Sequence, residues 1–368
     1  MTGRDPLTIV HVLDPVSLQD RAMLRQRRVP GVPCTDAAAM CCVSAVREMQ
    51  QVDAGLQHEY VVVGSAREEQ LLARCGINTS NRINRSAAAR SLRRYLRDRF
   101  DSSDSCIVCC WSSTSLYALA SELPDVRVIG IVLDDPGLTS GSPMVYLDPP
   151  FVDVPDALPS CSYLIPSPQH RDTFRSQWRQ DNEVPDNACV LALLGSHAHT
   201  EPPFQFAMLL GRLAACGVDV IGAARCASEP VARFRQFERA TNAACIIINE
   251  PERTVIDQLL CADIAVSFRT AGTVPVAHEV SIALAMGVPI VIGSGVVSET
   301  MLPDVHKKQA VALANDPSAM ARPLLKLLDD MALCQPLIDA GVIHDPTRDE
   351  RFARSVLELV HAASPMRV

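Results

Sequence analysis

A short segment in the C-terminal half of the chain carries residue types that could bind an oxyanion. Arg269 directly follows an apolar run, and Gly272 and Thr273 lead from it into a helical pattern that contains Glu279. A guanidinium can form two parallel hydrogen bonds to a phosphate, so Arg269 is the candidate for the main phosphate contact, or else lies in water or pairs with Glu279. Gly272 and Thr273 would add backbone N–H groups or simply cap the helix. Glu279 would hold a ribose or complement the helix dipole.

Three other places in this half put glycine or polar residues directly after apolar runs. Gly195 and Ser196 follow one run, where a glycine lets a phosphate approach the backbone but also makes a tight turn. Arg225 ends a second run and could reach a base or a phosphate, or lie in solvent. Glu250 follows a third run, where Asn249 could cap a helix. Together these residues predict an edge that binds a phosphate-bearing ligand.

In the N-terminal half, an aspartate pair and a tryptophan stand after apolar runs. Asp134 or Asp135 could act as a general base, although Asp-Asp-Pro-Gly is also a turn signal. Trp111 could stack on a sugar ring or belong to the core. The arginine-rich helix expected at residues 90–99 is interpreted as a solvated face.

The fourteen cysteines give little support to a metal site. Several lie inside apolar runs, where cysteine behaves as a small hydrophobic residue. Cys106 and Cys109 have C-x-x-C spacing, but they lie in an expected buried strand, and zinc would need a second pair at loop spacing. We therefore expect reduced, mostly buried cysteines and no metal or other cofactor.

Composition indicates an ordinary globular protein of about two domains. The chain has 368 residues, of which 48% are hydrophobic and 21% charged. A net charge of -8 gives no reason to expect a nucleic-acid partner. No apolar run is long enough to span a membrane, and the N-terminus lacks the apolar core of a signal peptide. The sequence therefore predicts a cytoplasmic protein.

Apolar strands and helical patterns alternate through both halves. The expected strands cover residues 7–13, 58–64, 106–111, 126–133, 145–154, 161–165, 188–194, 218–222, 244–248, 264–268 and 289–292. The expected helices cover residues 36–49, 67–75, 86–100, 115–123, 169–179, 204–216, 231–240, 254–260, 276–286, 317–330 and 349–363. Such alternation is typical of α/β proteins with parallel sheets covered by helices on both faces. The pattern predicts two Rossmann-like domains.

A polar stretch at residues 181–187 marks the expected domain boundary. We expect an N-terminal domain of residues 1–180 and a C-terminal domain of residues 188–348. The final segment, 349–368, is expected to return to the first domain, because Val356, Leu357 and Val360 form an apolar stripe that needs a surface.

The segment Ala283-Leu284-Ala285-Met286-Gly287-Val288-Pro289-Ile290-Val291 resembles the "EAMAxGxPVV" motif of GT-B fold glycosyltransferases of the group 1 type. Further segments resemble the same family in the same order: Ser105 to Asp135, Cys161 to Trp178, and Glu250 to Asp263. The resemblance implies a GT-B architecture with an inter-domain cleft, an acceptor-side N-terminal domain and a donor-binding C-terminal domain in which Glu250 would contact the nucleoside. It implies transfer of a sugar from a nucleoside diphosphate donor to a carbohydrate or lipid-linked acceptor.

The chain departs from that family where its members bind the donor. Val274 and Ile282 stand where two glutamates eight residues apart are common, and the loop at Gly195 has no lysine or arginine before Arg212. We therefore assign the catalytic roles to Arg269, Glu279 and Asp134, without a metal. Two alternatives stay open: a non-catalytic GT-B-like partner or scaffold protein, and a nucleotide-sugar 2-epimerase.

Overall fold

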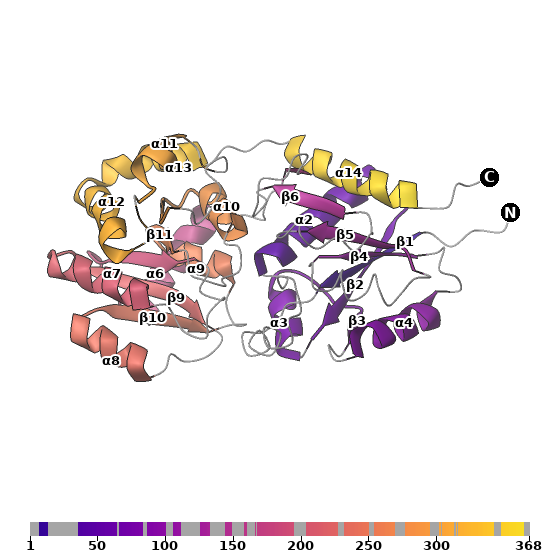
Figure 1. Ribbon diagram of the computed structural model, residues 1–368, viewed down its shortest axis with the longest axis horizontal. Coiled ribbons are helices and arrows are strands. Elements are labelled where there is room, and N and C mark those ends of the chain that lie inside the picture. Colours follow the sequence, from indigo (N-terminus) through magenta and orange to yellow (C-terminus); the bar gives the residue numbers. More distant parts are fainter. Residues whose placement is uncertain are drawn as a thin grey trace. The chain divides into compact units, whose positions relative to one another are not determined.

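The chain forms two compact units in the computed structural model shown in Figure 1. The first unit contains Met1–Tyr163 and Asp345–Val368, and the second contains Leu164–His344. The structure describes residues 7–13, 36–64, 66–83, 87–100, 106–111, 126–132, 144–148, 158–159, 166, 168–194, 204–226, 232–249, 254–268, 277–294, 302, 304–312, 314, 316–341 and 347–363. Each unit is a parallel sheet covered by helices, so the predicted α/β class with Rossmann-like halves is confirmed.

The first unit is built on a seven-stranded sheet in the order β3-β2-β1-β4-β5-β6-β7. Its strands are β1 (Thr8–Leu13), β2 (Gln57–Val63), β3 (Asn81–Ile83), β4 (Cys106–Cys110), β5 (Val128–Val132), β6 (Met144–Asp148) and β7 (Leu158–Pro159). Every residue of β1 and of β4 is buried. Continuous burial is expected where helices cover both faces of a parallel sheet.

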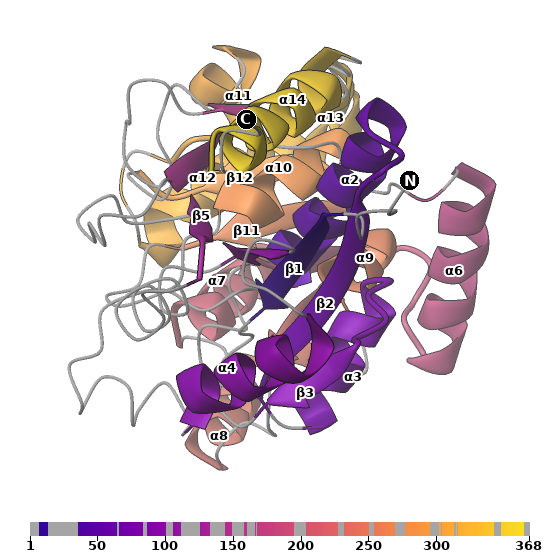
Figure 2. The same ribbon diagram turned by 90° about the vertical axis from the view of Figure 1, so that its right-hand side faces the viewer.

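Four described helices cover the first sheet: α2 (Asp36–Val52), α3 (Ala66–Arg74), α4 (Ala88–Arg99) and α14 (Thr347–Ala363). Helix α4 packs Leu92 and Leu96 into a core that also contains Val10 of β1. Figure 2 shows α2 and α14 on the other side of the sheet, where they pack against each other. The apolar stripe of α14, which includes Val356 and Val360, is buried there.

The second unit is built on a five-stranded sheet in the order β10-β9-β8-β11-β12. Its strands are β8 (Cys189–Leu193), β9 (Val220–Cys226), β10 (Ala244–Asn249), β11 (Ile264–Ser267) and β12 (Ile290–Ile292). Its helices are α6 (Pro168–Asp181), α7 (Phe204–Ala215), α8 (Ala232–Thr241), α9 (Val255–Cys261), α10 (Ala277–Ala285), α11 (Asp304–Gln309), α12 (Pro317–Asp329) and α13 (Cys334–Gly341). Helix α7 contacts α8 and α12, and helix α9 contacts α6 and α10.

Close packing of α7 on the sheet requires a glycine in β9. A Cβ atom at Gly222 would lie 2.7 Å from Cδ1 of Leu210 and 2.8 Å from Cε1 of Phe206. Both side chains are fully buried in the main core of this unit. Because such a core has little spare volume, a side chain at this position would force Leu210 and Phe206 to shift.

The domain boundary differs from the expectation that placed it at residues 181–187. Helix α6 belongs to the second unit, because it packs on α9 and its arginines Arg175 and Arg179 both bind Asp263. The polar stretch after α6 is therefore a turn inside the second unit, and not a linker. Charge pairing between residues 84 or 88 positions apart gives no local signal in the sequence.

Several element boundaries also differ from the expectations. Strand β9 continues to Cys226, whereas its expected end was Gly222. Of the extended segment expected at 145–154, residues 145–148 lie in β6, and residues 149–154 lie outside the described residues. No strand or helix was expected at β3, β7, α11 or α13. The expected helix 115–123 and strand 161–165 lie outside the described residues.

None of the described helices is long and apolar enough to cross a membrane. Ten cysteines of the described residues are free thiols, and eight of these are buried.

Candidate functional site

The C-terminal sheet reverses its strand order between β8 and β11. The chain continues from β8 to α7 and from β11 to α10, and these two helices pack in different layers. Val266 of β11 pairs with Leu193 of β8, and the N–H of Leu194 donates to the carbonyl of Val266 over 2.8 Å. In doubly wound sheets, ligands bind outside the carboxyl ends of the strands at such a switch point. The residues after Leu194 and after Phe268 thus start from neighbouring strand ends.

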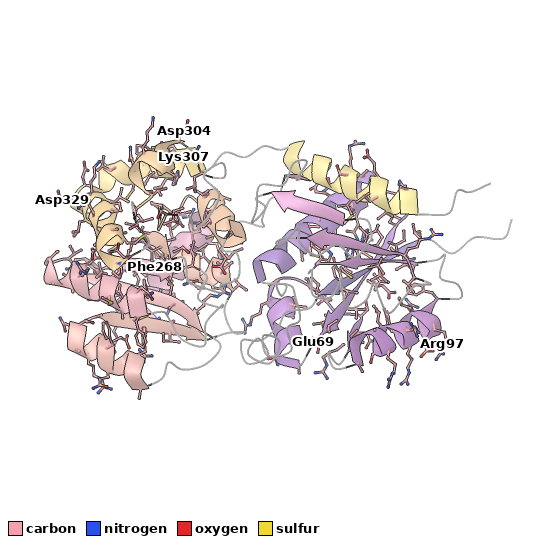
Figure 3. All side chains as sticks on the ribbon, viewed as in Figure 1. Glu69, Arg97, Phe268, Asp304, Lys307 and Asp329 are labelled. Carbon is pink, nitrogen blue, oxygen red and sulfur yellow. The ribbon has the colours of Figure 1, made fainter. Side chains whose placement is uncertain are left out.

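Most of the residues predicted for the site lie outside the described residues. They are Asp134, Gly195, Ser196, Glu250, Arg269, Gly272 and Thr273. The described residues fix where the intervening segments begin. Phe268, labelled in Figure 3, is 5% exposed, so the chain is still inside the unit one residue before Arg269.

Arg225 and Glu279 are the two predicted site residues that the structure describes. Arg225 lies within β9, one residue before its end, and is 1% exposed, so the alternative that it lies in solvent is wrong. Glu279 lies in the first turn of α10 and is 2% exposed. A charge costs several kcal/mol to bury without compensation, and both side chains lie almost entirely out of solvent within this unit.

Gln258 of α9 links the last residue of β8 to the middle of β9, and nothing in the sequence indicated this contact. Its Nε2 donates to the carbonyls of Leu193 and Ala223 over 2.9 and 2.8 Å. Helix α9 is itself fixed at its start by a capping box between Thr254 and Asp257. One amide therefore sets the spacing of β8 and β9 beside the switch point.

Two buried polar groups at this end of the sheet have no hydrogen-bond partner among the described residues. They are the hydroxyl of Ser267, at the end of β11, and the imidazole of His306, in α11. Burial lowers the pKa of His306 to about 4, so this imidazole is neutral at pH 7. The sequence signal for Ser267 was its position as the one polar residue inside the apolar run that precedes Arg269.

In the first unit, Trp111 belongs to the core and not to an open stacking surface. It is fully buried, and its Nε1 donates to Nδ1 of His11 over 3.0 Å. Nε2 of His11 lies 3.0 Å from Nδ1 of His58. The ring of Tyr60 stacks on His11 at a centroid distance of 5.4 Å. The apolar run from Cys106 to Trp111 predicted a buried strand and gave no sign of this polar cluster.

Comparison with known proteins identifies the fold. No family model and no curated protein matches the sequence. Among solved structures, HepE of Anabaena in complex with UDP and glucose is similar, with a TM-score of 0.64, 10% identity and coverage of 97% of this chain and 100% of that chain. A UDP-GlcNAc 2-epimerase from Neisseria meningitidis bound to UDP-GlcNAc has a TM-score of 0.59, 12% identity and coverage of 97% and 100%.

A glycosyltransferase from Rickettsia africae is also similar, with a TM-score of 0.58, 12% identity and coverage of 99% of this chain and 100% of that chain. The chain therefore has the GT-B fold that glycosyltransferases and UDP-GlcNAc 2-epimerases share, and the resemblance found in the sequence is confirmed at the level of the fold. At identities of 10–12%, these likenesses extend to the fold and not to the reaction.

Proposed function

We propose that this protein binds a nucleoside diphosphate sugar at the carboxyl edge of the C-terminal sheet and transfers the sugar to a carbohydrate or lipid-linked acceptor. The observation that carries the proposal is the pairing of β8 with β11. It starts the segment with Gly195 and Ser196 and the segment with Arg269 from adjacent strand ends. A switch point of this kind suits a ligand with phosphate groups.

The proposed chemistry needs positive charge near the diphosphate as the glycosidic bond breaks. Arg269 supplies it, and backbone N–H groups at Gly272 and Thr273 add donors without a metal. Arg225 and Glu279, both buried in this unit, are the candidates for contacts to a base or phosphate and to a ribose. Asp134 is the sequence-derived candidate for the acceptor base.

A thermal-shift and calorimetric titration with UDP, GDP, ADP and their sugars tests the donor site. The wild-type protein is expected to bind one of these series. Arg269→Ala should weaken binding by about tenfold or more, because a charge-assisted hydrogen bond contributes about 1.5–3 kcal/mol. Arg239→Ala, at an exposed position on α8, is the matched control and should leave affinity unchanged.

Epimerases among the similar structures support one alternative reaction. Incubation with UDP-GlcNAc and no acceptor separates the two activities, because inversion at C2 detected by NMR would identify an epimerase. Sugar transfer that requires an added acceptor would identify a transferase. Absence of binding by every nucleotide would leave the third reading, a non-catalytic partner or scaffold protein.

A further inference from the structure

The amino edge of the C-terminal sheet carries an open pocket of about 950 Å³. It lies where three strands begin: Cys189 is the first residue of β8, Asp219 directly precedes β9, and Asp263 directly precedes β11. Helices α6 and α12 supply further lining residues. Since the proposed nucleotide site is at the carboxyl edge, this pocket is a separate place in the same unit. Its volume is in the range of small-molecule sites.

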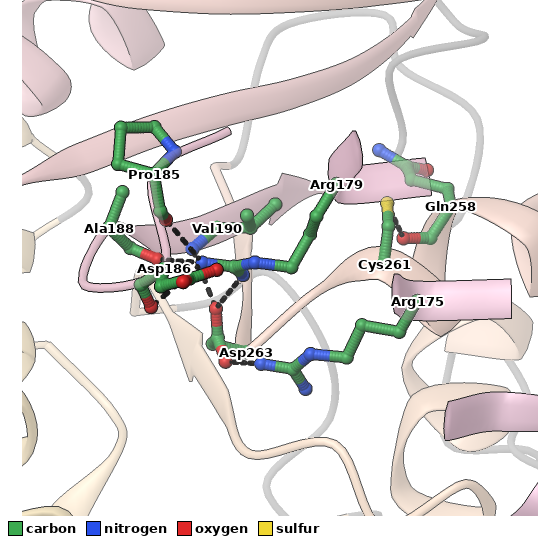
Figure 4. A network of polar contacts seen from close by, with 9 residues as sticks. All are labelled: Arg175, Arg179, Pro185, Asp186, Ala188, Val190, Gln258, Cys261 and Asp263. Atoms are coloured by element: carbon green, nitrogen blue, oxygen red, sulfur yellow. Dashed lines mark hydrogen bonds and ion pairs between the residues drawn. The ribbon is translucent and has the colours of Figure 1, made fainter. Parts of the chain in front are cut away.

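The polar end of the pocket is organised around the carboxylate of Asp263. Figure 4 shows that this carboxylate binds the guanidinium groups of Arg175 and Arg179. It also accepts the backbone N–H of Val190 over 2.8 Å. Two cations therefore share one anion, which leaves an excess of one positive charge at this end of the pocket.

The two arginines differ in how fully they are used. Arg179 also donates to the carbonyls of Pro185 and Ala188 over 2.9 and 2.6 Å, and its side chain is 13% exposed. Among the described residues, the guanidinium of Arg175 binds the carboxylate of Asp263, and the Arg175 side chain is 38% exposed. In Figure 4, one terminal nitrogen of Arg175 points away from the carboxylate. Arg179 is thus a structural group, whereas Arg175 keeps donors for a second anion.

The electrostatic state of Arg175 agrees with this difference. Burial, and then the positive charge of Arg179 nearby, lower the pKa of its guanidinium. Both causes act against the charged form, and an anion placed beside Arg175 would offset them. A guanidinium matches carboxylate and phosphate groups in shape as well as in charge.

The rest of the lining limits the ligand in two ways. Leu325, Leu328 and Val218 form a partly buried apolar wall. The exposed rim carries the carboxylates of Asp186, Asp219 and Asp329 beside one cation, Lys326. These carboxylates repel a ligand with several negative charges and attract hydrogen-bond donors. Figure 3 shows Asp329 on the outer side of the unit.

We propose that this pocket binds a small molecule that carries one carboxylate or phosphate, paired with Arg175, and hydroxyl or ammonium groups directed at the aspartates of the rim. The proposal does not depend on the nucleotide site. The unfolding temperature of each variant therefore serves as the internal control for folding.

Calorimetric titration with gluconate and with phosphoethanolamine tests the proposal and separates the carboxylate from the phosphate, with glucose as the neutral probe. The wild-type protein is expected to bind one of the two anionic probes more tightly than about 10 mM and to bind glucose no better than background. Arg175→Gln should weaken binding by about tenfold or more. Arg171→Gln, one turn earlier on α6 and outside the lining, should have no such effect.

Two measurements keep the test decisive if Arg175→Gln disturbs the network. Arg175→Lys keeps the charge but not the fork geometry, so its affinity should lie between those of the wild type and the glutamine variant. Cys216 is an exposed thiol in the pocket lining, so a bound probe should slow its alkylation, measured by mass spectrometry of its peptide. Failure of both anionic probes to bind, or equal binding by wild type and Arg175→Gln, would overturn the proposal.

Discussion

Nε1 of Trp111 donates a hydrogen bond of 3.0 Å to Nδ1 of His11. Because Nδ1 accepts, neutral His11 carries its proton on Nε2, which lies 3.0 Å from Nδ1 of His58. His58 must then carry its own proton on Nε2, a buried atom that has no partner among the described residues. The direction of all three N–H groups is therefore set by the indole, which can only donate. Both imidazoles are neutral in this arrangement.

The first prediction is that acid destabilises the first unit at a pH where carboxylates are still ionised. Burial lowers the pKa of His58 to about 4, and burial with the nearby His58 lowers the pKa of His11. An unfolded histidine titrates near 6.5, so between about pH 6.5 and 4 the unfolded state binds more protons. Stability should therefore fall as the pH falls through this window, by up to about 1.4 kcal/mol per pH unit for each histidine.

Urea unfolding between pH 7.5 and 4.5 measures this dependence. His58→Gln should reduce the slope, whereas His170→Gln, at an exposed position on α6, should keep it. An unchanged slope in the His58 variant would show that the cluster does not control acid stability.

The second prediction concerns Asp263, which holds α6 against the sheet. Asp263→Asn leaves two partly buried guanidinium groups without their carboxylate, and this should cost about 2–4 kcal/mol of unfolding free energy. Hydrogen exchange in α6 should rise at the same time. Asp172→Asn, an exposed change on the same helix, is the control and should shift neither quantity measurably. Equal stability of the two variants would refute the assignment of Asp263 as the anchor.

A third prediction addresses the amide that joins β8 and β9. Gln258→Leu removes both hydrogen bonds to Leu193 and Ala223 while keeping most of the buried volume. The expected loss is about 1–3 kcal/mol, measured by denaturant unfolding. Nucleotide affinity should fall as well, because Leu193 ends the strand that leads into the proposed donor loop at Gly195. Gln335→Leu, on the exposed surface of α13, should change stability by less than about 0.5 kcal/mol.

The fourth prediction is that Gly222→Ala destabilises the C-terminal unit by about 1–3 kcal/mol. The added methyl group would lie 2.7 Å from a terminal carbon of Leu210 and 2.8 Å from the ring of Phe206. Thermal unfolding measures the effect. The double variant with Leu210→Ala should lose less stability than the sum of the two single changes, because the cavity left by Leu210 accepts the methyl group. A fully additive double variant would show that contact with Leu210 is not the cause.

The sequence alone determined the α/β class and most strands and helices of the described residues. Continuous apolar runs such as Val128–Val132 and amphipathic helices such as α4 carry their burial pattern locally, so no distant contact is needed to find them. The GT-B resemblance rested on the same kind of local signal, the helix and strand from Ala283 to Val291. What followed about reaction and donor remains a proposal.

The tertiary structure decided the features that depend on residues far apart in the chain. The position of Arg225 near a strand end does not reveal that its side chain is buried. The assignment of α6 to the second unit depended on Asp263, which lies more than eighty positions away in the chain. The link from Trp111 to His11 spans a hundred positions. A side chain's own sequence neighbours set its periodicity, whereas its burial, charge state and hydrogen-bond partners are set by whichever elements fold against it.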